Sequence, residues 1–305
     1  MDPPEPLTLA LALVDAHHHF QELRDNRYPW LAAGAPEKLE GDLGPIRRDY
    51  LPPDYAADFA GVELVASVHV QNGWDPSDPV AETRWLEAQA AATSRPDAIV
   101  AYANLAAPDV GALLAAHAAQ LRVRGIRQIL NWHPDPRYRV ASTPDLMIDP
   151  AWRAGYALLA RHHLSFDLQL YWPQMDMALA LARAFPETQV VLDHFGMPID
   201  RTAEGLASWA AAMRRLSAAS NVAVKLSGLG LGHPRWTVED TVPLLRQTIE
   251  LFGPERTMVG TNLPVDRLFA PPAQTFQALG VAVADLSDAE RHLILQGTAA
   301  RVYRL

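Results

Sequence analysis

The sequence predicts an α/β fold in which one (β/α)₈ TIM barrel forms a single domain over residues 1–305. Short apolar or β-branched runs alternate with longer helical patterns along the whole chain, which is typical of a parallel sheet with helices outside it. There are eight such runs, the number of strands that closes this barrel. An open, doubly wound sheet is the alternative, but it more often has a glycine-rich phosphate loop after its first strand, where this chain has three histidines.

Each strand is expected where a short apolar run ends at polar or turn-forming residues. The eight expected strands are Leu11–Ala16, Val62–Val70, Ile99–Leu105, Gly125–Leu130, Ser165–Tyr171, Gln189–His194, Val222–Ser227 and Thr257–Asn262. The expected helices include Val80–Thr93, Val110–Leu121, Trp152–His162, Met175–Ala184, Leu206–Ala218 and Val238–Phe252. Two of them have start signals, because Asp149-Pro150 precedes one and Thr237 with Asp240 resembles a capping box before another.

A long segment, residues 21–53, follows the first strand and is rich in Pro, Gly and charge. Long loops in compact domains are usually functional or disordered, so we expect this loop to cover the active site. We find no internal repeat, low-complexity tract or linker in the sequence. One domain is therefore predicted.

The composition argues against several classes of function. The net charge of -9 disfavours nucleic acid and anionic membranes as partners, because both attract basic patches. The absence of cysteine excludes disulfides, thiolate metal sites and cysteine nucleophiles. The apolar run Leu7–Val14 follows acidic residues and is too short to span a bilayer, so we interpret it as a buried first strand. We expect a cytoplasmic protein with a small, anionic substrate, no nucleic-acid or membrane partner, and homo-oligomerisation as an option.

Polar residues recur at every second position near the ends of the expected strands. Side chains alternate along a strand, so one parity faces the barrel interior and the other faces the helices. Assigning the apolar parity to the helices leaves a polar set that is expected to point inward: Asp15, His17, His19, Ser67, His69, Gln71, Arg127, Asp167, Gln169, Tyr171, Lys225 and Ser227. A purely structural interior is filled by Val, Ile and Leu, so these polar groups indicate a ligand.

Five of the inward residues are expected to bind the substrate: Arg127, His69, Gln71, Tyr171 and Lys225. Arg127 is suited to hold a carboxylate through two parallel hydrogen bonds, and we favour this role over a structural pair with Asp167. His69 is interpreted as a substrate contact or as a hydrogen-bonded part of the lining.

Four motifs lie at the ends of expected strands. VDAHHHF, residues 14–20, has a D-x-H-x-H spacing that places Asp15, His17 and His19 on one face. Two imidazoles at this spacing can bind one divalent metal or orient one substrate oxyanion. The other motifs are LDHFGMP (192–198), which contains His194, KLSGL (225–229) and MVGTNLPVD (258–266).

With these motifs, the sequence resembles the amidohydrolase superfamily over essentially its whole length, including GWDPSDPVAETRWLEA (73–88), RGIRQILNWH (124–133) and GTAARVYRL (297–305). It is most similar to the branch that contains 2-pyrone-4,6-dicarboxylate lactonase and L-fuconolactonase. The resemblance implies that His17, His19 and His194 polarise a substrate carbonyl and that Arg127 holds a substrate carboxylate. It also implies a site without an essential metal, although more distant relatives, including decarboxylases, use one divalent ion.

The segment after the eighth strand departs from the superfamily pattern G-[ST]-D-x-P, because residues 260–264 read Gly-Thr-Asn-Leu-Pro. An amide cannot act as a general base near neutral pH, so Asn262 is expected to orient the water instead. The base is then Asp266, four residues later, or a histidine. Asp193 is expected to face the helices, and Asp15 is expected to orient a histidine from deeper in the barrel.

The predicted function is a hydrolase that opens a lactone or related cyclic ester bearing a carboxylate. The predicted catalytic residues are His17, His19, His194, Asn262 and Asp266. No cofactor is expected to be required; the alternative is one divalent ion such as Zn²⁺, bound by the three histidines with water in the fourth position. Two rival functions stay open: a metal-dependent decarboxylase or hydrolase on the same barrel, and a non-catalytic binding protein that lost its base at Asn262.

Overall fold

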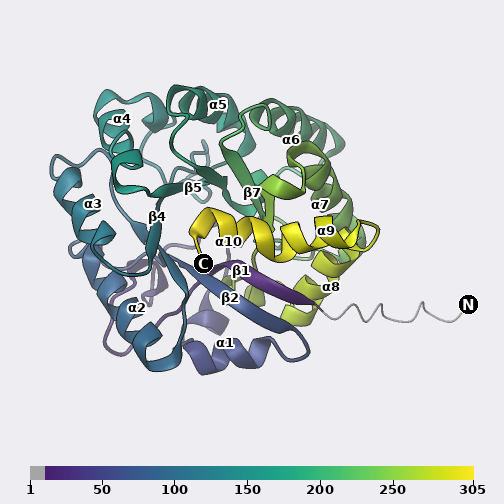
Figure 1. Cartoon of the computed structure of the whole chain (residues 1–305), viewed down its shortest axis with the longest axis horizontal. Coiled ribbons are helices and arrows are strands. Elements are labelled where there is room, and N and C mark those ends of the chain that lie inside the picture. The colour runs from purple at the N-terminus through teal and green to yellow at the C-terminus, as the bar shows by residue number, and fades with distance from the viewer. Residues whose placement is uncertain (1–10) are drawn as a thin grey trace, which may run out of the picture.

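The computed structural model describes residues 11–305 (Figure 1). Of the apolar run Leu7–Val14, residues 7–10 lie outside the described residues, and the rest leads into the first strand. No helix in the described part of the chain is long and apolar enough to cross a membrane.

Eight parallel strands follow one another in chain order around the sheet, as predicted. They are β1 (Ala12–His18), β2 (Glu63–Val70), β3 (Ala98–Tyr102), β4 (Val123–Ile129), β5 (Ser165–Gln169), β6 (Val190–Leu192), β7 (Val222–Leu226) and β8 (Thr257–Val259). Beyond β8 the chain returns to β1: the Asn262 amide donates to the His17 carbonyl and the His19 amide donates to the Leu263 carbonyl, both at 2.7 Å. These bonds join the two ends of the sheet into a nearly closed (β/α)₈ barrel.

Helices surround the barrel, and the last of them lies across its centre (Figure 1). They are α1 (Pro52–Asp58), α2 (Pro79–Thr93), α3 (Val110–Ala118), α4 (Pro150–Tyr156), α5 (Met175–Ala184), α6 (Ala203–Leu216), α7 (Val238–Phe252), α8 (Pro272–Val283), α9 (Asp288–His292) and α10 (Thr298–Tyr303). Both predicted start signals are confirmed. The Asp149 carboxylate accepts from the Trp152 amide at 2.8 Å at the start of α4, and Thr237 and Asp240 form a capping box at α7.

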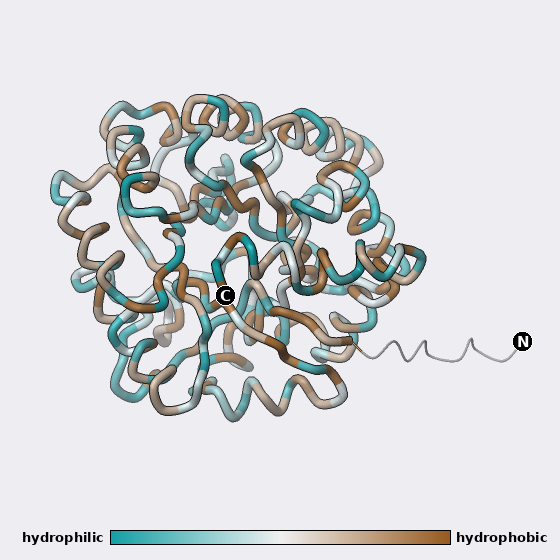
Figure 2. The backbone as a smooth tube through the Cα atoms, in the orientation of Figure 1, coloured by the Kyte–Doolittle hydropathy of each residue, from teal (hydrophilic) through white to brown (hydrophobic). Residues whose placement is uncertain are grey.

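Buried apolar residues form two layers, one on each side of the sheet. The outer layer lies between strands and helices and includes Phe166 and Leu168 of β5 with Trp152 of α4. The inner cluster joins residues from opposite sides of the barrel, which can meet only in its interior: Val14, Ala16, Ala66, Val68, Val70, Ala98, Val100, Val191, Ala223, Met258, Ala299, Val302 and Tyr303. In Figure 2 hydrophobic stretches follow the central strands and hydrophilic ones predominate in the outer loops.

The inner cluster corrects the predicted orientation of β2. Ala66, Val68 and Val70 fill the interior, so Ser67 and His69, which alternate with them, face the helix layer. Assigning apolar residues to the helices was wrong for this strand because small apolar side chains also fill the lower part of the barrel.

The pairing of β1 with β2 is irregular beside the site. Between Asp15 and His18, β1 advances three residues while β2 advances two, so β1 contains one extra residue. Such a bulge changes which side chains face each side of a sheet. Asp15 faces α1, where the Tyr55 hydroxyl donates to its carboxylate at 2.7 Å, whereas His17 points into the interior. The prediction that Asp15 and His17 share one face was therefore wrong.

The last helix closes the lower end of the barrel. Ala299, Val302 and Tyr303 lie on one face of α10 and belong to the inner cluster. In Figure 1, α10 (yellow) lies across the centre of the barrel, over β1. The Gln296 side chain, just before α10, donates to the Ala12 carbonyl of β1 at 2.8 Å, which attaches this segment to the first strand.

Candidate active site and metal centre

Three buried side chains form the centre of the candidate site: His17 at the end of β1, and Asp193 and His194 directly after β6. One possible ligand atom from each lies within 4.8 Å of the other two. Nδ1 of His17 is 3.3 Å from Oδ1 of Asp193, and Nε2 of His17 is buried without a hydrogen-bond partner among residues 11–305. Nδ1 also lies 3.4 Å from the Lys225 ammonium, and in the tautomer that carries its proton on Nδ1 the Nε2 lone pair is available to a metal.

The turn after β6 brings two adjacent residues into the same site. Asp193 has the parity of Val191, which lies in the inner cluster, so it faces the interior. His194 and Phe195 have left-handed backbones with φ of 54° and 39°, a conformation uncommon for residues other than glycine. This turn redirects His194 to the interior as well. The prediction that Asp193 faces the helices was wrong because it assumed regular alternation through His194.

Residues after β7 hold the His194 ring. Nδ1 of His194 is 3.0 Å from the Ser227 hydroxyl oxygen. Gly228 has φ of 65°, and a Cβ there would lie 2.5 Å from Nδ1 of His194, so only glycine fits against the ring. Burial lowers the pKa of His194 to about 4, which keeps the imidazole neutral near pH 7. When Nδ1 donates to Ser227, the Nε2 lone pair is available to a metal or a proton.

A buried cation lies beneath the histidines. The Lys225 ammonium donates to the Asp167 carboxylate and is 3.2 Å from Oδ1 of Asp193 and 3.4 Å from Nδ1 of His17. Although burial opposes ionisation, Lys225 and His17 hold the pKa of Asp193 well below its ordinary value. Lys225 was predicted to bind the substrate; the structure places its ammonium among carboxylates, where it neutralises them.

Arg127 crosses the barrel interior from β4. Its guanidinium donates to the Gln169 side chain at 2.9 Å and to the Gln71 carbonyl, and its Nη1 is 4.0 Å from Oδ2 of Asp193. Asp167, the structural partner considered for Arg127, is instead bonded to Lys225. Arg127 is thus a fixed cation in the interior, beside the His17–Asp193–His194 cluster.

Asn262 joins His19 to Asp266. Nε2 of His19 is 3.3 Å from Oδ1 of Asn262, and Nδ2 of Asn262 donates to Oδ1 of Asp266 at 2.9 Å. The Leu229 amide donates to the other Asp266 oxygen at 2.9 Å. Burial raises the pKa of Asp266 to about 7. The neighbouring Arg267 pairs with Asp58 and not with Asp266.

The protonation of Asp266 controls which way the Asn262 amide faces. An ionised Asp266 accepts from the amide nitrogen, which leaves the amide oxygen toward His19. A protonated Asp266 can donate to the amide oxygen, and the amide nitrogen then donates to Nε2 of His19. Nδ1 of His19 lies 2.6 Å from the Val70 carbonyl, so Nδ1 carries a proton and Nε2 is the basic nitrogen of the neutral ring.

Three of the predicted substrate-binding residues have other contacts. His69 packs against His18 and Phe20, with ring centroids 5.6 and 5.8 Å apart, on the helix side of β2. Gln71 accepts from the Gly73 amide through its side chain, so it shapes the loop after β2. The Tyr171 hydroxyl donates to the Tyr138 carbonyl at 2.9 Å in an apolar cluster above the barrel.

That apolar cluster, which we call the roof, joins the loop after β1 to loops after other strands. Its buried members are Tyr28, Leu31, Leu43, Ile46, Tyr171, Met197, Leu231 and Val265. An isolated bridge pairs Gln21 with Tyr50 near the two ends of the loop, and the Gln21 side chain donates to the Ile46 and Arg48 carbonyls.

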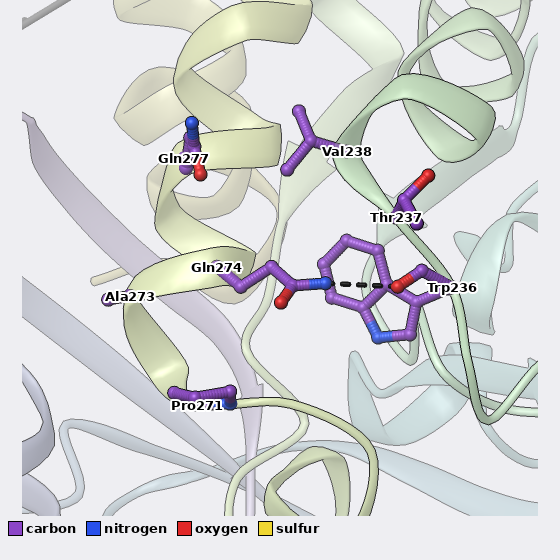
Figure 3. A pocket seen from close by; sticks show the side chains of 7 residues that line it. All are labelled: Trp236, Thr237, Val238, Pro271, Ala273, Gln274 and Gln277. Carbon is purple, nitrogen blue, oxygen red and sulfur yellow. Dashed lines mark hydrogen bonds between the residues drawn. The ribbon is translucent and has the colours of Figure 1, made fainter. Parts of the chain in front are cut away.

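Two surface cavities accompany this architecture. One, of about 570 Å³, lies beside the roof and is lined by the loop segment 37–42, Arg137 and Phe269, among others. The other, of about 450 Å³, lies between α7 and α8, where the Gln274 side chain donates to the Trp236 carbonyl at 3.0 Å (Figure 3). Neither cavity is lined by His17, His19, His194 or Arg127, so both lie outside the histidine cluster.

Sequence reasoning missed Tyr303 and misplaced Asp193. Tyr303 belongs to the closing segment 297–305, which gives no strand signal. Only the packing of α10 brings its hydroxyl to the Asp167 carboxylate, at 2.8 Å. The adjacency of Asp193 to His194 was a usable signal, because both end the same strand. Asp15 accepts from the Thr261 amide and hydroxyl, so it holds β1 to the segment after β8 and does not orient a ring.

The chain resembles known proteins over nearly its whole length. Residues 14–305 match the family model described as Amidohydrolase. An uncharacterized protein of Sinorhizobium fredii is 40% identical over 295 residues, covering 97% of this chain and 99% of the relative. The L-fucono-1,5-lactonase of Burkholderia multivorans is 32% identical over 309 residues, covering 96% of each chain. An amidohydrolase crystal structure from Burkholderia multivorans with bound zinc has a TM-score of 0.81 at 29% identity, covering 96% of this chain and 99% of the neighbour.

The expectation that no metal is required is wrong. The structural neighbour with a TM-score of 0.81 contains zinc, and this chain has a buried His/Asp/His cluster that could hold a metal ion. The cluster consists of His17, Asp193 and His194, so an aspartate takes the place expected for His19. Two neutral imidazoles, one with an unpartnered buried Nε2, and an anionic oxygen are a donor set that suits catalytic zinc.

Proposed function

Because this chain belongs to the amidohydrolase family, we propose that it is a hydrolase that opens the ring of a small lactone bearing a carboxylate. The observation that carries the proposal is the buried His17–Asp193–His194 cluster, which faces an arginine inside the barrel. The lactonase names of relatives at 32% and 31% identity support a cyclic ester as the substrate class.

His17, Asp193 and His194 are the residues that would hold the metal. When bound, a divalent ion there supplies Lewis acidity toward a carbonyl oxygen or a bound water. Asp193 lies 3.3 Å from Nδ1 of His17, and the Ser227 hydroxyl lies 3.0 Å from Nδ1 of His194, so each ring is held on its Nδ1 side.

The remaining polar residues bind the substrate and move the proton. Arg127 is a permanent cation whose two terminal nitrogens keep further hydrogens, and we assign it the substrate carboxylate. His19 is neutral because burial and the Arg127 charge hold its pKa well below its ordinary value. We assign His19 the role of general base through Nε2, with Asn262 holding the water and Asp266 holding Asn262. Both Asp266 oxygens already accept hydrogen bonds, which favours this indirect role over direct proton abstraction.

The loop 21–53 is proposed to cover the substrate, since its residues build the roof with loops after β5, β6, β7 and β8. Access to the histidines then requires movement of this loop, because His17, His19 and His194 are at most 3% exposed. A cytoplasmic location and self-association stay predictions from the sequence.

A panel of 1,4- and 1,5-lactones, with and without a ring carboxylate, tests the proposed function. Acid release is followed with a pH indicator for the wild type and for His194→Asn. We expect turnover of at least one lactone and a loss of about 10²-fold or more in the variant. An active wild type whose turnover is unchanged by His194→Asn would place the chemistry elsewhere, and a wild type inactive on every lactone would contradict the substrate class.

A further inference from the structure

A line of buried charges leads from the C-terminal helix to the proposed metal centre. The Tyr303 hydroxyl donates to the Asp167 carboxylate at 2.8 Å. The same carboxylate accepts from the Lys225 ammonium, which lies 3.2 Å from Asp193. Asp193 in turn contacts Nδ1 of His17 at 3.3 Å.

This line is costly as structure alone. Asp167, Lys225, Asp193 and Tyr303 are all fully buried. Buried ion pairs are often no more stable than well-packed apolar residues of similar volume, so burial of this set is weak evidence for a stabilising role. The surrounding interior is built from Val, Ala and Met, and an apolar filling here would match it. A role in the site above accounts for the charges better.

The Lys225 ammonium is shared between the carboxylates of Asp167 and Asp193. The more strongly it pairs with Asp193, the more its charge opposes binding of a metal ion by that carboxylate. The Tyr303 hydroxyl donates to the same Asp167 oxygen as the ammonium, and this hydrogen bond stabilises the ionised form of Asp167 that pairs with Lys225. The ring of Tyr303 also lies against Lys225, with Nζ 5.3 Å from the ring centroid, an arrangement that favours a cation at this position. Both contacts hold Lys225 toward the lower end of the barrel.

We propose that Tyr303 is a positioning residue of the active site: by holding Asp167, it keeps Lys225 shared between Asp167 and Asp193, so that Asp193 is not paired with the ammonium alone and can bind the metal beside His17. The proposal rests on the proposed metal centre and deepens it. Loss of the hydroxyl weakens the hold of Asp167 on the shared ammonium, which then pairs more fully with Asp193, where its charge competes with a divalent cation. A residue in the last turn of the chain then affects metal binding at the opposite end of the barrel strands.

The test compares Tyr303→Phe with Tyr156→Phe. Tyr156 is also fully buried, but its hydroxyl has no partner among residues 11–305 and its ring packs in the outer layer against Trp152 and Phe166. Each variant loses one hydroxyl from a buried ring, so the pair separates the hydrogen bond to Asp167 from a general packing effect. The readouts are Zn²⁺ affinity, from competition with a chromophoric chelator, kcat and KM on the lactone found active, and thermal unfolding.

We expect Tyr303→Phe to weaken Zn²⁺ binding by about 10- to 100-fold, the range typical of lost outer-shell contacts, and to lower kcat about 10-fold with KM little changed. Tyr156→Phe should match the wild type in both. Equal Zn²⁺ affinity and kcat in the two variants would overturn the proposal. If the wild type binds zinc but opens no lactone, the proposed function is contradicted, and the Zn²⁺ affinities of the two variants still decide the role of Tyr303. If the wild type neither binds zinc nor opens a lactone, the proposed function and the role of Tyr303 are both overturned.

Discussion

The side-chain amide of Asn262 lies between His19 and Asp266. In the proposed mechanism, this arrangement lets His19 take up a proton in a site that lacks the aspartate of the superfamily pattern. The ionised Asp266 accepts from Asn262, which turns the amide oxygen toward Nε2 of His19 and favours proton uptake there. When Asp266 is protonated, the amide nitrogen occupies that lone pair. In the proposed mechanism the amide therefore transmits the protonation state of Asp266 to His19, the proposed base.

A pH profile follows from this arrangement. Because burial raises the pKa of Asp266 to about 7 and the ionised form is the active one, kcat/KM should rise as pH increases through about 7. In Asp266→Asn this rise should vanish, with turnover lowered at every pH. Asp176→Asn, an exposed change on α5, serves as the control. Persistence of the same midpoint in Asp266→Asn would exclude Asp266 as its source.

Replacing the Asn262 amide tests the same connection between Asp266 and His19. Asn262→Asp puts a carboxylate 2.9 Å from the Asp266 oxygen, where two like charges cannot both ionise easily and no amide N–H remains to donate. We expect a loss of kcat of about 10²–10⁴-fold at pH 7. Steady-state kinetics on the active lactone measure it, and a gain in turnover would show that the amide is dispensable.

Arg127 provides the prediction for substrate binding. Arg127→Met should cost about 2–5 kcal/mol in kcat/KM on a carboxylate-bearing lactone, with most of the loss in KM. The matched control is Arg124→Met on the same strand, because Arg124 donates to the Leu121 carbonyl outside the site. Equal kinetics for the two variants would show that Arg127 only supports Gln169 and the Gln71 carbonyl.

At the scale of elements, the eight strands and most helices follow from apolar runs and capping signals, and β5 and β7 present the predicted polar faces. Regular alternation fails where the backbone is irregular. The extra residue in β1 separates Asp15 from His17, and the left-handed turn after β6 brings Asp193 and His194 to one site. Neither irregularity has a local sequence signal, because both depend on contacts with distant strands.

The loop 21–53 carries the element-scale prediction. If it covers the substrate, binding of the hydrolysed product should slow hydrogen exchange of its backbone amides by more than about 10-fold, because the open form is then less populated. Exchange in α6, on the outer ring, should not change. Mass spectrometry of peptides from both segments measures this, and equal exchange with and without product would contradict the covering role.

At the scale of the whole molecule, the residues that stabilise the barrel and those proposed to act in catalysis lie at different levels along its axis. Small apolar side chains and α10 fill the lower end, charged pairs occupy the middle, and the histidines lie at the strand ends beneath the roof. This order could be predicted in outline from strand alternation and the barrel fold. The contribution of Tyr303 could not, because it depends on how the chain's last turn packs into the interior.

The central claim is that His17, Asp193 and His194 form a metal centre for lactone opening. The most direct measurement is lactone hydrolysis by protein freed of metal with a chelator and then titrated with Zn²⁺, with bound metal determined in the same samples. The account predicts loss of activity in the metal-free protein and full recovery at one Zn²⁺ per chain. Full activity in the metal-free protein would contradict it.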